Sequence, residues 1–179
     1  MEEKIITKFT VATGESIDNL MALGRELNEE QYSAFLKKDQ LRQYVSNYFN
    51  EKYLIEEVNS LSNQWLIVYQ NTKAIGYARL TSKGKHPLIT TGKRTIRIAG
   101  FGILKEYTNE LTLKSLFDKC LMVSKAYEMV WMNEHPSNTF LPFFKENGFR
   151  HLDENAVLDE LPHSSVYLLK ENVIQDTKK

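Results

Sequence analysis

The chain of 179 residues is 42% hydrophobic and 26% charged, which predicts a globular domain with an ordinary hydrophobic core. Lysine plus arginine and aspartate plus glutamate number 23 each, which excludes a strong global field that would draw the chain to nucleic acid or to an anionic membrane. The single cysteine, Cys120, excludes an internal disulfide and any zinc site built from cysteine pairs.

The sequence shows no pattern of export, membrane insertion or metal binding. Its start, Met-Glu-Glu-Lys, is acidic, and no apolar segment of a signal peptide follows it. The longest uninterrupted apolar run, residues 65–69, is far shorter than the roughly 20 residues that span a bilayer. The four histidines lack the spacing of metal ligands. We therefore expect a cytoplasmic protein without a metal site.

Hydrophobic periodicity predicts a strand, three helices and a β-hairpin in the first half of the chain. The expected elements are a strand over 4–11, helices over 15–28, 41–49 and 51–61, and hairpin strands over 64–70 and 74–81. Asn50 is expected to cap the third helix, because asparagine side chains accept hydrogen bonds from the first turn of a helix. The glycine and proline content of residues 82–93 predicts a loop.

The second half of the chain alternates between strands and helices and ends in a further hairpin. We expect strands over 95–104 and 129–133, helices over 110–127 and 137–147, and hairpin strands over 150–157 and 164–169 joined by 158–163. Gly148 should stop the second of these helices. We expect one domain over 1–170 and a polar tail over 171–179, because no repeat or linker divides the sequence.

The unit formed by residues 95–149 ends in an aromatic pair, Phe143 and Phe144, followed by Gly148 and Phe149. It resembles the acyl-CoA-binding half of the GNAT superfamily of N-acetyltransferases, and the order of elements resembles the GNAT fold over nearly the whole chain. Within that superfamily, residues 39–57 and the Ala-Ile-Gly-Tyr at 74–77 are most similar to bacterial polyamine acetyltransferases of the PaiA type. The resemblance implies an α/β (α+β) fold, with a twisted mixed β-sheet and helices on both faces.

The resemblance also implies that acetyl-CoA is the co-substrate. In such proteins the pantetheine arm pairs with a strand, and the pyrophosphate sits at a helix N-terminus, where unpaired N–H groups and the helix dipole favour anions. The residues that match these cofactor contacts are Phe101, Gly102, Ile103, Thr108, Asn109, Glu110, Leu111, Thr112, Leu113, Asn138, Thr139 and Phe144.

The pyrophosphate turn departs from the family pattern, Q/R-x-x-G-x-G/A. Leu111 and Leu113 occupy the two small-residue positions, and Thr108 replaces the longer donor. Glu110 adds a carboxylate where a diphosphate should sit. We therefore expect weakened acetyl-CoA binding. The alternative is an ordinary capped helix, with Asn109 or Thr108 as its N-cap.

Two further features of the cofactor region leave alternatives open. Gly100 and Gly102 interrupt a predicted strand, either because a ligand approaches the backbone or because a helix crowds it. Thr139 stands in the place of a family asparagine, and Asn138, one residue away, is a substitute for it. Phe144 stands in the place of the family's tyrosine and cannot donate a proton.

Glu134 and His135 end the strand that precedes the last helix, and they are the candidate catalytic residues. A histidine beside a cofactor groove can act as an acid or base near neutral pH, although a solvated loop histidine is the common case. Tyr32, Tyr44 and Tyr48 lie in the region that lines substrate sites in the superfamily, or belong to the core. We expect Cys120 to be a buried, inert thiol.

The leading functional prediction is acetyl-CoA-dependent N-acetylation of a small amine or peptide amino group by direct transfer, without a metal. The alternative is a catalytically weak or inactive GNAT-fold protein that binds a ligand or protein partner through the same cleft. Homodimers are frequent in the superfamily, so a homodimer is a further expectation from the resemblance.

Overall fold

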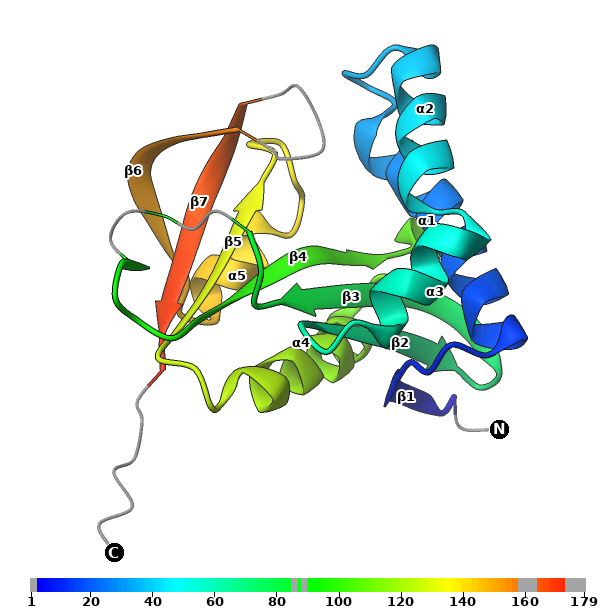
Figure 1. Ribbon diagram of the computed structural model, residues 1–179, viewed down its shortest axis with the longest axis horizontal. Helices are drawn as coiled ribbons and strands as arrows, with labels where there is room; N and C mark the ends of the chain where they lie inside the picture. The colour runs from blue at the N-terminus through cyan, green and yellow to red at the C-terminus, as the bar shows by residue number, and fades with distance from the viewer. Residues whose placement is uncertain (1–2, 85–86, 88–89, 158–163, 173–179) are drawn as a thin grey trace, which may run out of the picture. The chain divides into compact units, whose positions relative to one another are not determined.

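The computed structural model of the protein describes residues 3–84, 87, 90–157 and 164–172 (Figure 1). The chain divides into two compact units, which are described one at a time. Unit 1 comprises Met1–Leu80 and Gly100–Cys120, and unit 2 comprises Thr81–Ala99 and Leu121–Lys179. The strands form one mixed sheet in the order β1-β2-β3-β4-β5-β7-β6.

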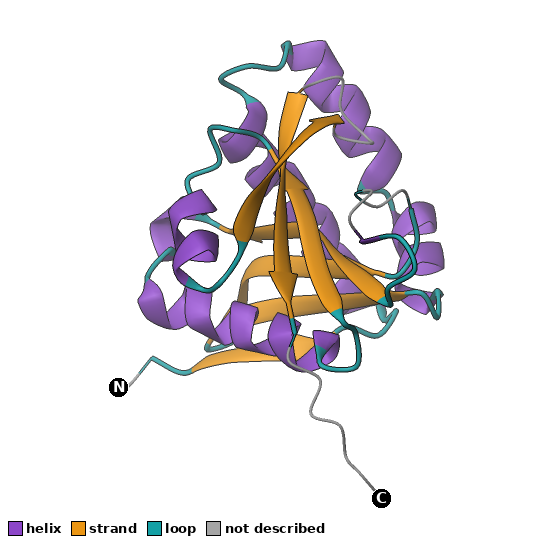
Figure 2. Ribbon diagram, turned by 90° about the vertical axis from the view of Figure 1, so that its left-hand side faces the viewer, coloured by secondary structure: helices purple, strands orange, loops and turns teal. Residues whose placement is uncertain are grey.

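Helices and strands follow each other in the predicted order, and Figure 2 distinguishes the two kinds of element by colour. The helices are α1 (Gly14–Tyr32), α2 (Lys38–Tyr48), α3 (Glu51–Asn59), the 3-10 helix η2 (Lys105–Tyr107), α4 (Glu110–Ser124) and α5 (Leu141–Glu146). The strands are β1 (Ile5–Phe9), β2 (Asn63–Gln70), β3 (Lys73–Thr81), β4 (Thr95–Ile103), β5 (Met129–Glu134), β6 (Arg150–Val157) and β7 (Ser164–Glu171).

In unit 1, α1 and α3 bury their apolar faces against β2 and β3. The shared core contains Leu20, Leu27, Leu54, Trp65 and Ile67, all at most 4% exposed. Asn50 caps α3 as predicted, because its side-chain oxygen accepts a hydrogen bond from the Tyr53 N–H at 2.9 Å. β1 pairs antiparallel with β2.

Helix α4 begins in unit 1, and its first three turns pack on strand residues of that unit. The rings of Phe101 on β4 and Phe117 on α4 meet edge to face at 6.5 Å. The hydroxyls of Thr7 on β1 and Ser115 are hydrogen-bonded at 2.8 Å. Cys120 is fully buried, and burial raises the pKa of its thiol, so the expectation of a buried thiol is confirmed and the group is poorly reactive.

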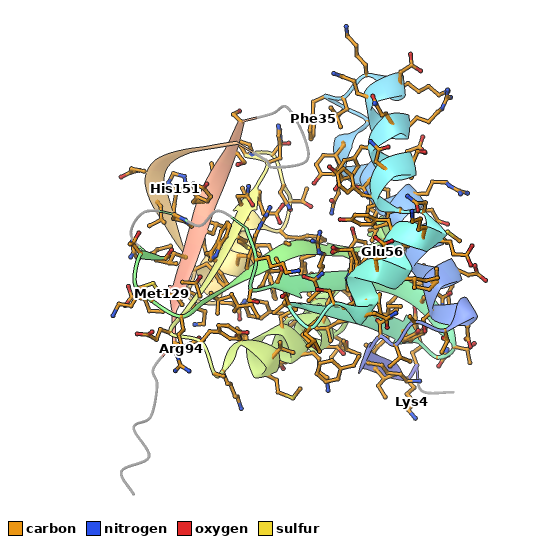
Figure 3. The ribbon with its side chains drawn as sticks, viewed as in Figure 1. Lys4, Phe35, Glu56, Arg94, Met129 and His151 are labelled. Atoms are coloured by element: carbon orange, nitrogen blue, oxygen red, sulfur yellow. The ribbon has the colours of Figure 1, made fainter. Side chains whose placement is uncertain are left out.

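In unit 2, β4 and β5 run parallel, whereas β5–β7 and β6–β7 are antiparallel. The parallel pair starts at Thr95, opposite Met129. Just before it, the carbonyl of Arg94 accepts from the Met129 N–H at 3.3 Å, and Figure 3 labels both residues. The Arg94 N–H donates to the Glu128 carboxylate at 2.9 Å, and this bond lowers the pKa of Glu128. Trp131, Leu152 and Leu169 form an apolar cluster across the three strands.

The helix ends differ from the sequence predictions for local reasons. Helix α4 stops at Ser124 rather than 127, because the Asn172 side chain donates to the carbonyls of Ser124 and Tyr127, both at 2.9 Å. Glu171 is the last residue of β7, and the Asn172 side chain bonds to the C-terminal end of α4 and to Tyr127 beyond it. Helix α5 starts at Leu141 rather than 137, because a turn held by Asn138 precedes it.

Some expectations fall on residues that the structure does not describe. The connection over 158–163, His86, His163 and the tail from 173 lie outside the described ranges. Within those ranges, no helix is long and apolar enough to cross a membrane. No group of three histidine, cysteine, aspartate or glutamate side chains that could hold a metal ion is found among the described residues.

Candidate functional site

The residues predicted to form the site are distributed over both units. Unit 1 holds the residues from β4 to the start of α4, namely Phe101, Gly102, Ile103, Thr108, Asn109, Glu110, Leu111, Thr112 and Leu113. Unit 2 holds Glu134, His135, Asn138, Thr139 and Phe144. The unit 1 residues lie on one continuous stretch of chain, and in unit 2 Asn138 bonds to Glu134.

The C-terminal end of β4 is tightly packed in unit 1. The side chains of Phe101 and Ile103 are buried, so only their backbone groups could pair with a ligand. A Cβ atom added at Gly102 would lie 3.2 Å from the side chains of Gln31 and Leu27, which belong to α1. Crowding beneath α1 is therefore sufficient to explain the glycine at 102. At Gly100 the nearest atom would be in the ring of Tyr77, at 3.3 Å.

Hydrogen bonds hold the turn between β4 and α4. The Thr108 hydroxyl donates to the carbonyl of Leu104 at 3.2 Å, so Thr108 stabilises the turn rather than capping the helix. The Lys105 N–H donates to the Glu30 carboxylate at 3.0 Å. Lys73 donates to the Tyr107 hydroxyl at 2.6 Å, and this bond raises the pKa of Lys73. The position of the α4 N-terminus is thus fixed by bonds to α1 and β3.

Asn109 is the N-cap of α4. Its side-chain oxygen accepts from the Thr112 N–H at 3.0 Å, and the Thr112 hydroxyl accepts from the Asn109 N–H at 3.1 Å. This reciprocal pair is a capping box with threonine in the place of the usual glutamate or glutamine. The turn is therefore an ordinary capped helix start, which was the alternative expectation, and its N-cap is Asn109 rather than Thr108.

Two backbone N–H groups at the start of α4 have no acceptor within the part of the chain that the structure describes. Among the described residues, no group accepts from the backbone N–H of Glu110 or Leu111. The Leu111 side chain is 71% exposed, and the Glu110 side chain is exposed as well. The helix end can therefore receive an anion, but it also carries a carboxylate of its own.

The capping box predicts a measurable loss of stability on substitution. We expect Asn109→Ala to lower the free energy of unfolding by about 1 kcal/mol, because the Thr112 N–H loses its acceptor. Urea titration followed by circular dichroism measures the change. Thr112→Ser, which keeps the hydroxyl, serves as the matched control, and Thr112→Val should resemble Asn109→Ala. Equal stability of all three variants would show that the box contributes nothing.

In unit 2, Asn138 connects Glu134 to the start of α5. Glu134, the last residue of β5, is 7% exposed, and its carboxylate accepts from the Asn138 side-chain amide at 2.7 Å. The Asn138 side-chain oxygen in turn accepts from the Phe140 N–H at 2.8 Å. The carboxylate is therefore held in one orientation at the C-terminal end of a parallel strand.

His135 is half-buried and is oriented by Ser137. Its Nδ1 atom accepts from the Ser137 N–H at 3.2 Å and lies 2.6 Å from the Ser137 hydroxyl. We assign the neutral ring a proton on Nε2, because Nδ1 acts as an acceptor. In this tautomer the Nε2 atom is a hydrogen-bond donor, and the ring gives up a proton near neutral pH only from its charged form, in which both ring nitrogens carry a proton.

The other two predicted residues of unit 2 differ in their surroundings. Thr139 is exposed at the surface. Phe144 is fully buried, and its ring contacts Phe143 at 5.7 Å and Phe149 at 5.9 Å. A tyrosine hydroxyl at position 144 would thus need a buried partner, which explains in part why an apolar ring suits this chain.

Sequence reasoning missed a buried polar pair on β4 and β5. Arg97 is 5% exposed, donates to the Asn133 side-chain oxygen at 2.6 Å and lies 5.1 Å above the Trp131 ring. Asn133 directly precedes Glu134, so the pair steadies the end of β5 from which the candidate carboxylate projects. An arginine inside an otherwise apolar strand pattern was the available signal.

No family model matches the sequence, and no curated protein matches it. Solved structures do match its fold. The PaiA N-acetyltransferase from Thermoplasma acidophilum, in complex with coenzyme A, has a TM-score of 0.75 at 16% identity, over 94% of this chain and 99% of that chain.

Two GNAT-family acetyltransferases are similar over comparable lengths. The Staphylococcus aureus protein has a TM-score of 0.68 at 13% identity, over 96% of this chain and 100% of that chain. The Streptococcus pneumoniae protein has a TM-score of 0.64 at 15% identity, over 95% and 100%. The chain therefore has the GNAT acyltransferase fold, and the prediction of that fold is confirmed.

Proposed function

We propose that this protein is an N-acetyltransferase that moves the acetyl group of acetyl-CoA to a small amine or amino group. The observation that carries the proposal is the match of fold, over 94% of the chain, to an acetyltransferase whose structure contains coenzyme A. The capped but open N-terminus of α4 and the fixed carboxylate at the end of β5 support it.

The start of α4 is the proposed contact for the cofactor diphosphate. The N–H groups of Glu110 and Leu111 would donate to it, and the dipole of a 15-residue helix would favour it. The Glu110 carboxylate opposes this attraction, and the exposed Leu111 side chain limits close approach of the backbone. Binding should therefore be weak for this fold.

The proposed roles of Glu134 and His135 follow from their bonding. An amine must lose a proton to attack a thioester, and the departing thiolate must gain one. Glu134 is an acceptor held by Asn138, which suits it to take the amine proton, directly or through water. In the charged form of His135 the Ser137 hydroxyl can accept from Nδ1, and the Nε2 proton is the one that would pass to the thiolate and leave the neutral ring.

Calorimetric titration with acetyl-CoA tests the proposal. We expect Glu110→Gln to tighten binding about two- to fivefold, because it removes a charge that is worth about 0.3–1 kcal/mol at a helix terminus. Asp118→Asn is the matched control, because Asp118 is an exposed carboxylate further along the same helix, paired with Lys114 at 2.8 Å.

The titration, together with an assay for acetylated product, separates the two functional predictions. Binding of acetyl-CoA together with acetylation of any amine supports the enzyme. Binding without turnover across amines, peptides and polyamines would leave a GNAT-fold binding protein. No binding of acetyl-CoA by the natural chain or by Glu110→Gln would refute the proposal.

A further inference from the structure

Four buried polar atoms in unit 1 have no hydrogen-bond partner among the residues that the structure describes. They are the Thr10 hydroxyl oxygen, the Asn63 side-chain oxygen, Nε1 of Trp65 and Nε of Arg79. Asn63 and Trp65 lie on β2 and are each 4% exposed, the half-buried Arg79 lies on β3, and Thr10 directly follows β1. The described part of the chain has six such atoms, so most of them gather on three neighbouring strands.

The strand register places the side chains of β1 and β2 on the same face of the sheet. Phe9 is paired with Leu66, and the next residue, Thr10, donates its N–H to the Trp65 carbonyl at 2.8 Å. Thr10 and Trp65 therefore lie opposite each other across an antiparallel pair, and opposite residues share a face. Asn63 precedes Trp65 by two residues, which returns its side chain to that face at a spacing of about 6.6 Å along the strand.

Arg79 on β3 and Glu57 on α3 join this face in one network. The guanidinium carbon of Arg79 lies 5.7 Å from the centre of the Trp65 ring, and Arg79 pairs with Glu57 at 2.8 Å. The Glu57 carboxylate also accepts from the Asn63 side-chain amide at 2.9 Å. Figure 3 labels Glu56, the neighbour of Glu57 near the end of α3. The unpartnered atoms thus belong to residues that are already held against one another.

The bonding capacity that remains in the network defines what it can bind. Nε1 of Trp65 and Nε of Arg79 can only donate, the Asn63 oxygen can only accept, and the Thr10 hydroxyl can do either. Arg79 and Glu57 neutralise each other, so a charged ligand would find no free counter-charge here. The ligand must also be small, because Asn63 and Trp65 are almost completely buried. Water is neutral and small and both donates and accepts, and a buried water typically makes about three such bonds.

We infer that this network is an internal hydration site, in which an ordered water molecule accepts from the Trp65 indole N–H and donates to the Asn63 side-chain oxygen. Two hydrogen bonds of about 2.9 Å through one water span up to about 5.8 Å, which is close to the spacing of alternate residues on a strand. The same water or a second one serves Thr10 and Arg79. Because Glu57 belongs to the network, the water helps to fasten the end of α3 to the sheet. The inference is independent of the proposed function.

Contacts between water and the Trp65 indole proton test the inference on the natural chain. Water-selective Overhauser spectra, recorded in the laboratory and rotating frames, should show a cross-peak between this proton and water with the sign of a long-lived contact. The chain has two tryptophans, so Trp131→Phe identifies the signal of Trp65. The rotating-frame spectrum separates a contact from chemical exchange by sign. No cross-peak, or one that arises from exchange or from bulk water alone, would overturn the inference.

A second test compares two threonines of the same short segment. Thr10→Val removes the unpartnered hydroxyl, and Thr7→Val, the matched control, removes one that lies 2.8 Å from the Ser115 hydroxyl. If water bonds to Thr10, both variants should unfold at a lower urea concentration than the natural chain, because each loses a satisfied hydrogen bond. An unchanged or higher midpoint for Thr10→Val, beside a lower one for Thr7→Val, would overturn the inference, because removal of an unhydrated, unpaired hydroxyl from a buried site is not costly.

Discussion

Replacement of Gly76 by alanine is expected to cost about 3 kcal/mol of stability, the upper end of the range for overpacking. A Cβ atom at Gly76 on β3 would overlap the carbonyl oxygen of Gly102 and lie 2.9 Å from the Cα of Ile103. Both are backbone atoms of β4, so no side chain can rotate to relieve the contact. The two strands would have to separate where the Leu104 N–H donates to the Ile75 carbonyl at 2.9 Å.

Thermal unfolding measures this effect, and a fall in Tm of roughly 6–12 °C is expected for a chain of this size. Gly14→Ala is the control, because a Cβ at the first residue of α1 would meet nothing within 4 Å. That variant should be as stable as the natural chain, or more stable by up to about 1 kcal/mol. A Gly76→Ala protein with an unchanged Tm would show that β3 and β4 do not approach so closely.

The order of elements and the fold could be predicted from the sequence, because burial of apolar side chains dominates both. The apolar stripe of α1 and the continuous buried run of β2 follow directly from the burial of apolar side chains. The ends of α4 and α5 could not, because distant or irregular contacts set them. Asn172 lies 48 residues from Ser124, and no local pattern at either position announces their bond.

One part of the candidate site, the N-cap of α4, could be predicted from the residue types. The Asn109 cap was one of two alternatives at the turn, since asparagine and threonine both favour the N-cap position. The structure distinguishes them, because the Thr108 hydroxyl bonds backward to the Leu104 carbonyl and Asn109 bonds forward to Thr112. The tautomer of His135 depends on the angle of a turn and could not be read from residue types.

Removal of the His135 imidazole is expected to reduce kcat about 10²- to 10⁴-fold, the range for loss of a general acid or base. The expectation follows from Ser137, which occupies the Nδ1 side of the ring, so that the charged form of His135 would transfer the proton on Nε2. His135→Ala should leave the affinity for acetyl-CoA within about twofold, because the proposed cofactor contacts are made by other residues.

The pH profile of kcat distinguishes proton transfer from simple positioning. The natural enzyme should show a limb between about pH 5 and 8, where histidine changes its charge, and His135→Ala should lack it. For a group that must donate a proton, kcat falls as the pH rises through this range, because the protonated form disappears. His151→Ala is the control, since His151 is an exposed histidine on β6 that pairs with Asp153 at 3.7 Å, and it should keep both the rate and the limb. A natural rate in His135→Ala, with the limb intact, would remove His135 from the mechanism and leave Glu134 as the titratable group at this end of β5.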